Sequence, residues 1–282
     1  PEGRVVAATS DKVWKVGTRQ VTRVRLASGR TIAATGEHRL LAGAGWTLVN
    51  GLRVGDRVAL SRRVPEAVNA ARWPELRVAL LGHLIGDGSY LRHQPLRYTT
   101  NNAENSDLVR RAGEEEFGCP VSRHEAPMGS WHQLVISGNG NRWHPAGVNA
   151  WLRELGIFGQ RSFQKRVPSS AFQLADDQVA LLLRHLWATD GSIVRRETGR
   201  GSHSVYYATT SEGLAYDVAA LLLRLGIIGR VTVATKLGYR PSFHVRVTGS
   251  DQLRRFLDVV GAFGPRRRQA ERMAEALIDV RS

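Results

Sequence analysis

Two stretches of this chain repeat each other, and each is an apolar run that ends in Asp-Gly-Ser. The first covers Leu80–Ser89 and the second covers Leu183–Ser192, so that their aspartates, Asp87 and Asp190, lie 103 positions apart. A helix cannot easily bury an unpaired carboxylate at its end. Two such helices packed side by side would bring both carboxylates to one end of a shared interface. The repeat therefore predicts a metal site on a pseudo-twofold axis, and this arrangement points to phosphodiester cleavage.

A single copy of the motif would have a simpler explanation, because a Leu-rich helix that stops at Asp-Gly is a common core helix. Here the surroundings of the two copies match as well. The matching pairs are Arg97–Asn102 with Tyr206–Ser211, Asn105–Phe117 with Gly213–Leu225, Gln133–Gly138 with His244–Gly249, and Trp151–Gly159 with Phe256–Gly264. A period near 100 residues indicates duplicated domains rather than a solenoid. We predict an α+β fold of two pseudo-symmetric αββαββα repeats, packed through their motif helices.

The charge of the chain indicates a polyanionic partner. Its 282 residues carry 40 Lys and Arg against 25 Asp and Glu, a net charge of +15, and a basic domain of this size commonly binds nucleic acid. A GC-rich genome would explain the preference for Arg over Lys, but it would not explain the net charge. The single cysteine, Cys119, excludes an intrachain disulfide and a zinc site built on cysteines. The chain contains no run of 18 apolar residues, so no membrane span is predicted.

The chain divides into four parts on sequence patterns. Residues 1–62 are expected to form a small all-β segment with strands at 21–26 and 31–35, and with a tight turn and a further strand within 52–60. Residues 63–74, with two prolines and many charges, are expected to be a connector. The first repeat then covers 75–175 and the second covers 176–282, which ends in an Arg-rich stretch with a helix.

The two motifs resemble the signature helices of the LAGLIDADG homing endonucleases. The first matches at Leu80, Gly82, Gly86, Asp87 and Gly88. The second keeps four of the expected residues, which are Leu183, Asp190, Gly191 and Ser192. It departs at His185, which stands opposite Gly82 where the family places a small residue. His185 could fit against Gly82 or weaken the helix interface, and the sequence leaves both possibilities open.

A second resemblance covers the N-terminal segment. Residues 29–40 look like the Thr-x-x-His block of an intein splicing domain of the Hint type, with Thr35 and His38 as its two named residues. The whole chain is similar to the inteins that interrupt bacterial replicative DNA helicases. The nucleophile block and the terminal His-Asn pair of such inteins are not seen. We therefore expect a partial Hint-like segment that does not splice, in a truncated or split intein whose other segments, or the exteins, would be its partners.

The resemblance to homing endonucleases implies a catalytic centre. It assigns Asp87 and Asp190 to Mg²⁺, with Mn²⁺ expected to substitute, and it makes the carbonyls of Gly86 and Thr189 further ligands. Such a hard ion prefers oxygen, so His83 and His185 are interpreted as residues of the helix interface. Lys165 matches the Lys-x-x-Pro block that follows the first repeat and would stabilise developing charge, although a solvated surface lysine is the alternative. No lysine stands in register after the second repeat, so an Arg of residues 266–268 would substitute and the two sites would be unequal.

The strands of both repeats are expected to read double-stranded DNA in the major groove. The DNA-binding candidates are Arg92, Arg97, Thr99, Arg123, His132, Arg195, Arg196, His203, Tyr206, Lys236, Arg240, His244, Arg246, Arg266 and Arg267.

These features predict a site-specific, Mg²⁺-dependent endodeoxyribonuclease that acts as a monomeric pseudo-dimer. Its target would be a long asymmetric site in the uninterrupted host gene, and its place would be the bacterial cytoplasm, bound to the nucleoid and to no membrane. Two alternatives remain open. One is a sequence-specific DNA-binding protein of the same fold without cleavage, and the other is a fragment of a protein-splicing intein.

Overall fold

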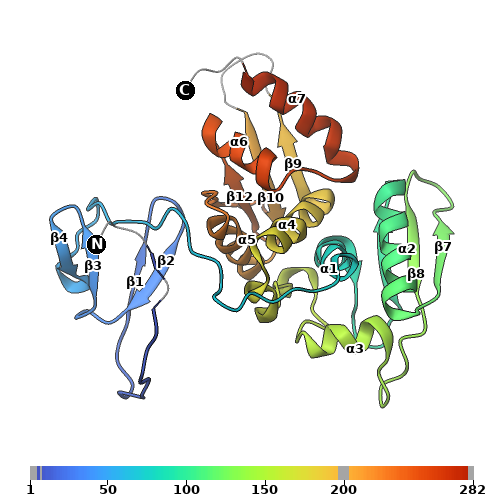
Figure 1. Ribbon diagram of the computed structural model, residues 1–282, viewed down its shortest axis with the longest axis horizontal. Helices are drawn as coiled ribbons and strands as arrows, with labels where there is room; N and C mark the ends of the chain where they lie inside the picture. The colour runs from blue at the N-terminus through green and yellow to red at the C-terminus, as the bar shows by residue number, and fades with distance from the viewer. Residues whose placement is uncertain (1–4, 7, 196–202, 279–282) are drawn as a thin grey trace.

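The structure, a computed structural model, describes residues 5–6, 8–195 and 203–278. Two αββαββα units follow each other in the chain and lie on either side of two central helices, α1 and α4 (Figure 1). The first unit consists of α1 (Glu75–Asp87), β5 (Gly88–Ser89), β6 (Leu96–Thr100), α2 (Ala103–Phe117), β7 (Val121–Glu125), β8 (His132–Ile136) and α3 (Gly147–Glu154). The second unit consists of α4 (Asp176–Asp190), β9 (Gly191–Val194), β10 (Ser204–Thr209), α5 (Glu212–Arg224), β11 (Arg230–Ala234), β12 (Ser242–Val247) and α6 (Ser250–Val259).

The two units share one topology. Their antiparallel sheets have the strand orders β5-β6-β8-β7 and β9-β10-β12-β11, which are equivalent along the chain. Short 3-10 turns, η2 (Ser162–Gln164) and η4 (Gly264–Arg266), follow the respective units, η3 (Ser169–Gln173) precedes α4, and α7 (Arg267–Ile278) closes the described chain. The predicted fold class of two pseudo-symmetric repeats is confirmed.

The equivalence extends to single hydrogen bonds at the starts of α2 and α5. Asn102 and Ser211 are the N-cap residues, and their side chains accept from the backbone N–H groups of Asn105 (3.0 Å) and Leu214 (3.2 Å). Such caps satisfy donors that the first turn of a helix leaves free. The N–H groups of the two cap residues in turn donate to Thr100 Oγ1 and Thr209 Oγ1, each at 3.1 Å. The matching Thr- and Asn/Ser-containing segments of the sequence are therefore strand-to-helix joints.

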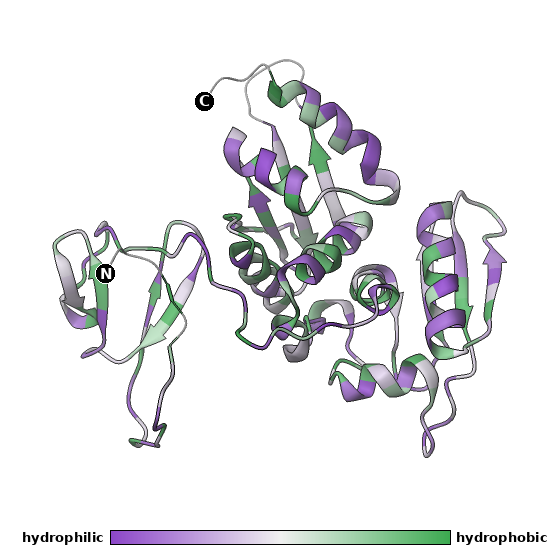
Figure 2. Ribbon diagram, viewed as in Figure 1, coloured by the Kyte–Doolittle hydropathy of each residue, from purple (hydrophilic) through white to green (hydrophobic). Residues whose placement is uncertain are grey.

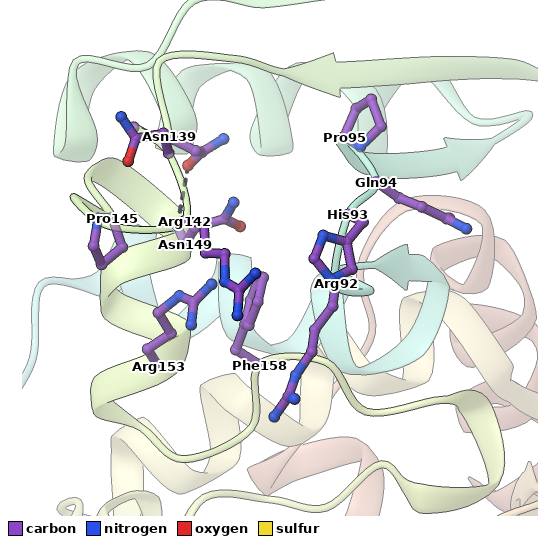
Figure 3. Close-up of a pocket in the computed structure, with 12 residues that line it drawn as sticks. Arg92, His93, Gln94, Pro95, Asn139, Arg142, Pro145, Asn149, Arg153 and Phe158 are labelled. Carbon is purple, nitrogen blue, oxygen red and sulfur yellow. Dashed lines mark hydrogen bonds between the residues drawn. The ribbon is translucent and has the colours of Figure 1, made fainter.

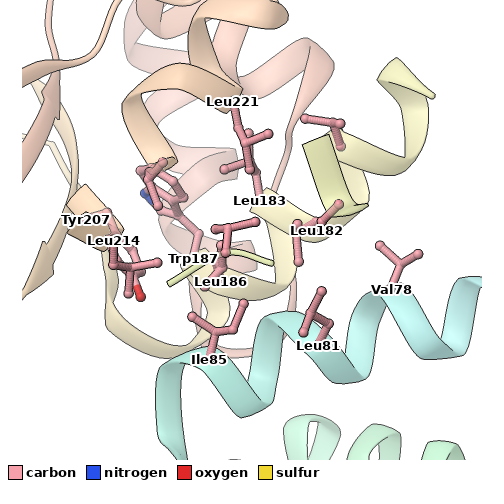
Figure 4. Close-up of a cluster of buried hydrophobic side chains, with 14 of the residues drawn as sticks. Val78, Leu81, Ile85, Leu182, Leu183, Leu186, Trp187, Tyr207, Leu214 and Leu221 are labelled. Carbon is pink, nitrogen blue, oxygen red and sulfur yellow. The ribbon is translucent and has the colours of Figure 1, made fainter. Parts of the chain in front are cut away.

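The motif helices form the centre of the hydrophobic core. Val78, Leu81 and Ile85 of α1 lie against Leu182 and Leu186 of α4 (Figure 4), and all five side chains are at most 1% exposed. A helix that is apolar on all sides is buried, and α1 and α4 are each covered by the sheets and helices of their own repeat as well as by each other. The outer helices α2, α6 and α7 are largely hydrophilic in colour (Figure 2), since they have solvent on one side.

The N-terminal segment forms two separate hairpins, β1 (Thr22–Arg25) with β2 (Thr31–Ala34) and β3 (Arg39–Ala42) with β4 (Gly45–Leu48), followed by the 3-10 turn η1 (Val49–Gly51). The two predicted strands at 21–26 and 31–35 are present with slightly shorter bounds. Within 52–60 the predicted tight turn is present at residues 54–55. The strand expected after it was wrong, because that stretch makes only a single bridge, between Val58 and Ala42.

Hydrogen bonds join this segment and the connector to the second repeat. In the β1–β2 turn, Ser28 O accepts from Val231 N (3.1 Å) on the edge strand β11, and Gly29 O accepts from Tyr216 Oη (2.9 Å) on α5. The connector is anchored at its end, where Trp73 N donates to the Gln178 side chain (2.8 Å) at the start of α4. No helix of the described residues is long and apolar enough to cross a bilayer.

Candidate active site

The two motif helices approach each other most closely at two glycines of α1. A Cβ atom on Gly82 would lie 2.8 Å from His185 Cβ and 3.0 Å from Leu182 O, and a Cβ atom on Gly86 would overlap the side chain of Thr189. Each glycine therefore faces the residue at the equivalent position of the other repeat. The larger residue fills the space that the glycine leaves, so His185 fits the interface rather than weakening it.

His83 and His185 form a buried pair inside this interface. His83 Nε2 lies 3.1 Å from His185 Nδ1, and His83 Nδ1 lies 2.8 Å from Tyr98 Oη. The two imidazoles are 0% and 3% exposed, and the ring of Phe263 lies 4.6 Å from that of His185. Their interpretation as helix-interface residues is confirmed. Burial lowers the pKa of both, that of His185 to about 3, so both rings are neutral near pH 7.

This burial predicts a pH-dependent stability that involves His185. Its folded pKa lies below that of the unfolded chain, about 6.5, so the unfolded state binds more protons below pH 6.5. Wild type should therefore lose up to about 1.4 kcal/mol of unfolding free energy per pH unit through this group as the pH falls, and His185→Gln should not. Denaturant unfolding of both proteins at pH 5.0, 6.0 and 7.5 measures the difference between their unfolding free energies. Taking this difference cancels the titration of the carboxyl groups, which both proteins share. A difference in unfolding free energy that does not change with pH would contradict this prediction.

The ends of α1 and α4 bring Asp87 and Asp190 together. Burial raises the pKa of both carboxyl groups, and the charge of Asp190 contributes to raising the pKa of Asp87 to about 7. Lys165 and Arg266 act on both carboxyls in the opposite direction. The structure therefore places two carboxylates and two cations in one electrostatic cluster, as the sequence predicted for the aspartates and for Lys165.

Lys165 is a buried residue, 7% exposed, so the alternative of a solvated surface lysine was wrong. Its Nζ donates to the carbonyls of Gly86 (2.7 Å), Gly88 (2.8 Å) and Leu84 (3.3 Å) at the end of α1. Burial lowers its pKa to about 8, while the two carboxylates favour its charged form. This lysine lines a cavity of about 330 Å³ together with Asp190 and residues of β10.

Arg266 is the counterpart of Lys165 in the second repeat. Its guanidinium donates to Thr189 O (3.3 Å), and Thr189 is the residue equivalent to Gly86, whose carbonyl accepts from Lys165. The sequence left open which Arg of residues 266–268 stands in for the missing lysine, and the structure places Arg266 there. Both carbonyls predicted as metal ligands thus already accept a hydrogen bond from a cation, which a divalent ion on the same oxygen would have to displace.

Two tyrosines beside the carboxylates were not predicted. The hydroxyls of Tyr90 and Tyr207 are buried, and that of Tyr207 interacts with the Asp190 carboxyl. Burial, and then the charges of Asp190 and Asp87, raise the pKa of Tyr207. Tyr207 pairs with Gly191 in the β9–β10 ladder, so its position next to the motif could have been found from the strand register.

The sheet of the first repeat has one helix-covered face and one face that the helices leave open. Alternating burial in β6 and β8 puts Leu96, Tyr98, Leu134 and Ile136 in the core. The residues between them, with their register partners, form what we call the first open face. Its polar members are Ser89, Arg97, Thr99, Ser122, His124 and Gln133. Arg97 and Thr99 therefore lie where they were predicted, and Gln133 and His124 were missed.

The second open face is built in the same way on the sheet of the second repeat. Tyr206 pairs with Arg246, which pairs with Arg230, and His244 lies in the next row beside Ala208. The Tyr206 and His244 rings are stacked, with centroids 5.7 Å apart, and the Arg246 guanidinium lies 5.2 Å from the Tyr206 ring centroid. Three predicted residues thus form one cluster, and Arg230 joins them as a residue that the sequence analysis missed.

Two predicted residues lie on the other side of the first sheet. Arg123 is in register with the core residue Leu134 and makes an ion pair with Glu125 (2.6 Å), and His132 is 4% exposed. Successive side chains of a strand point to opposite faces, so a hairpin whose pairing register is not known can have a residue assigned to the wrong face. Arg123 and His132 are therefore not part of the first open face, which corrects their prediction as DNA-binding residues.

The remaining candidates flank the open faces. Arg92 follows β5, Arg195 follows β9 and His203 precedes β10, whereas Arg196 lies outside the described residues. Lys236 and Arg240 lie in the β11–β12 loop over the rings of Tyr239 and Phe163, and Arg267 makes an ion pair with Glu104 (3.0 Å).

Thr35 and His38 lie in the turn between β2 and β3, where His38 N donates to Thr35 O (3.0 Å). Thr35 also lines a cavity of about 460 Å³ with Asn50 and Arg19.

Residues 177–261 match the model of a LAGLIDADG-like domain. They run from α4 to just beyond α6 and include Asp190. The second repeat of this chain is thus similar to the LAGLIDADG-like domain. The family match covers the second repeat, and the first repeat has the same topology and hydrogen bonds.

Curated relatives are similar over nearly the whole chain. Replicative DNA helicase DnaB of Rhodothermus marinus is 41% identical over 273 residues, which are 95% of this chain and 29% of the helicase. Protein RecA of Mycobacterium tuberculosis (strain H37Rv) is 33% identical over 269 residues, which are 89% of this chain and 33% of that protein. The chain thus spans about 30% of the length of the curated relatives it matches.

Solved structures of similar fold include the protein I-DmoI in complex with DNA and Mn, with a TM-score of 0.43 and 13% identity over 67% of this chain and 97% of that chain. The N-terminal LAGLIDADG domain of DUF199/WhiA aligns with a TM-score of 0.44 and 12% identity, over 67% of this chain and 83% of that one.

Proposed function

We propose that this chain is a site-specific endonuclease that cuts both strands of a long asymmetric DNA site as a monomer. One observation carries the proposal: Asp87, Asp190, Lys165 and Arg266 meet at the ends of the paired motif helices, between two open sheet faces, and Lys165 is buried there while Asp87 and Arg266 are partly buried. The similarity to about a third of both a replicative helicase and a RecA protein supports an element inserted into host genes. The target would then be the uninterrupted form of such a gene.

The cluster is suited to a divalent cation. Burial raises the pKa of both aspartates in spite of two nearby cations, so their charged forms are disfavoured, and a further cation would stabilise them. No group of three or more His, Cys, Asp or Glu gathers anywhere in the part of the chain that the structure describes. Asp87 and Asp190 would hold the ion, and water and DNA phosphates would supply the remaining oxygens. When bound, Mg²⁺ would polarise the scissile phosphates and stabilise the leaving oxygens, and Mn²⁺ would substitute.

The protein side chains would orient and stabilise the charges in this reaction. Lys165 and Arg266 each lie at one carbonyl beside a carboxylate, where a cation can stabilise the charge that develops on a phosphate. The neutral His83–His185 pair would keep the two helix ends in a fixed relation. The Tyr207 hydroxyl lies next to the Asp190 carboxyl and would orient this group or a water molecule.

Digestion of a plasmid that carries the uninterrupted host gene tests the proposal. With Mg²⁺ the protein should produce one cut near the insertion point, and EDTA should prevent it. Binding to the same DNA should weaken steeply with salt, because phosphate contacts release counterions. Absence of both cleavage and salt-sensitive binding would reject the function.

The difference between Lys165 and Arg266 predicts unequal cutting of the two strands. A guanidinium spreads its charge, keeps a higher pKa and hydrogen-bonds in a planar fork, whereas an ammonium is a compact charge. Nicked plasmid should therefore accumulate before linear product in a time course. Lys165→Arg should change the preferred strand or reduce the difference, as end-labelled strands on a denaturing gel would show. Equal rates on both strands in wild type would contradict this prediction.

A binding protein without cleavage is the second candidate, and one observation favours it. The carbonyls of Gly86 and Thr189 are hydrogen-bonded to Lys165 and Arg266, which reduces the number of free oxygens for a metal ion. A salt-sensitive gel shift without any Mg²⁺- or Mn²⁺-dependent cut would support this candidate.

A further inference from the structure

A second basic cavity lies in the first repeat, apart from the carboxylates. It has a volume of about 530 Å³ and lies between the β5–β6 loop, the β8–α3 loop and one side of α3 (Figure 3). Arg92, Arg142 and Arg153 line it, and no Asp or Glu does. Because Leu96 pairs with Ile136, this cavity lies at the end of the sheet where β6 begins and β8 ends.

The three arginines differ from their neighbours in having no acidic partner. None of them makes an ion pair within the described residues, whereas on nearby α2 Arg110 pairs with Glu114 (2.9 Å) and Arg111 with Glu115 (3.1 Å). The positive charge in the cavity is therefore not compensated by the protein. A concave surface of one sign of charge concentrates the field and attracts an ion of the opposite sign.

The walls of the cavity are held in place by specific contacts. The Arg153 guanidinium lies 4.0 Å from the ring centroid of Phe158. Asn149 N donates to Asn139 Oδ1 (3.0 Å), and Asn139 in turn donates to Ile136 O (2.7 Å), which fixes the β8–α3 loop to the start of α3. Arg92 lies in van der Waals contact with Gly159, where a Cβ atom would be 3.3 Å from its Cγ.

The β5–β6 loop contains a further sign of constraint. His93, which follows Arg92 and also lines the cavity, has a φ of 63°, and it is the only described residue other than glycine with a positive φ. Such a conformation costs free energy and is maintained where the surroundings require it. The loop is therefore held in a defined shape that presents Arg92 toward the cavity.

We propose that this cavity binds a phosphodiester group of the DNA backbone, outside the base pairs that the first open face contacts. Guanidinium groups donate two parallel hydrogen bonds to phosphate oxygens, and three of them with no acidic neighbour fit two adjacent phosphodiesters, each of which carries one negative charge. The exposed Trp143, with the Arg142 guanidinium 5.1 Å from its ring centroid, extends this surface. The inference rests on the proposed function, because it assigns to the same DNA a second anchoring point.

The test compares two double variants of equal charge. Arg142→Gln with Arg153→Gln removes two cations from the cavity, and Arg110→Gln with Arg111→Gln removes two paired cations from α2. Affinity for a duplex that spans the cleavage site is measured by fluorescence anisotropy from 50 to 300 mM salt. The cavity variant should bind about tenfold more weakly, because charged hydrogen bonds are lost. The slope of log K against log salt should decrease by about 0.9 for each phosphate contact that is lost. The α2 variant should keep the wild-type slope.

A charge-preserving variant and a folding control complete the experiment. Arg142→Lys with Arg153→Lys should keep most of the salt slope with reduced affinity, since the charge remains but the fork is lost. Circular dichroism and thermal unfolding should be unchanged in all variants that are compared.

Each outcome separates the cavity from the proposed function. Wild-type affinity and slope in the cavity variant would overturn the inference while leaving the endonuclease intact. Lack of DNA binding by the wild-type protein would overturn both. Titration calorimetry with inorganic phosphate and with ATP tests whether the cavity binds a free phosphate or a nucleotide instead of the DNA backbone. The alternative result is that the wild-type protein binds inorganic phosphate or ATP tightly, and that the cavity variant loses this binding while its salt dependence of DNA binding stays unchanged. This result would assign the cavity to a small phosphorylated ligand and reject the backbone contact.

Discussion

Asp87→Asn and Asp190→Asn are each expected to abolish double-strand cleavage, by about a thousandfold or more, and to leave DNA binding intact. Asparagine has the shape of aspartate but lacks the negative charge that holds a divalent cation. Each substitution makes the site more positive, so affinity for DNA should be equal or slightly higher. Removal of the charge at position 190 should also lower the pKa of Asp87, because that charge is one cause of its raised value.

Plasmid linearisation and anisotropy on one duplex measure the two properties separately. Asp107→Asn is the matched control, since Asp107 is exposed on α2 and makes only a long ion pair with Arg110 (3.7 Å). This control should cut at the wild-type rate. Undiminished cleavage by either motif variant would refute the role of that aspartate.

Gly86→Ala is expected to destabilise the fold by roughly 2–3 kcal/mol, because overpacking of a tight interface has effects of this size. The added methyl would overlap Thr189, and the helices would have to separate. Thr189→Gly alone should lose about 1–2 kcal/mol, because it removes a buried side chain and its hydrogen bond to Leu186 O (2.6 Å) and slightly lowers helix propensity. In the double variant the methyl has room, so its loss should be smaller than the sum of the two, with a coupling free energy of 1 kcal/mol or more.

Urea unfolding of the four proteins gives this coupling. Gly43→Ala serves as a control, because a Cβ atom there would lie 4.0 Å from the nearest heavy atom, in Arg57. Additive losses in the cycle would show that the contact at Gly86 does not limit the approach of the helices. The double variant should also recover part of the cleavage activity that Gly86→Ala loses.

The repeat in the sequence predicted the fold because its signals are local and strong. The apolar runs before Asp87 and Asp190, the caps at Asn102 and Ser211 and the matching hairpins each depend on neighbouring residues only. The strand predicted within 52–60 failed for the opposite reason. A pairing partner across the chain decides whether such a residue run becomes a strand.

The site was predicted in part, and the errors have physical causes. Lys165 was found through its motif, but its burial and its hydrogen bonds to the end of α1 depend on the packed helices. The errors at His132 and Arg123 came from the two-residue period of a strand, because a residue whose pairing register is not known can be assigned to the wrong face. Arg266 could be located only to a cluster of three arginines, because one sequence gives no register for a loop.

The contacts of His185 with Gly82 and of Thr189 with Gly86 have a consequence for how the two halves recognise each other. Two copies of the first half would set glycine against glycine and leave a gap at each position. Two copies of the second half would press imidazole against imidazole and threonine against threonine. Only the pairing of one half with the other fills the space. A gene that encoded either half by itself would therefore not yield a well-packed homodimer. The halves are then free to diverge in what they bind while remaining obliged to stay together.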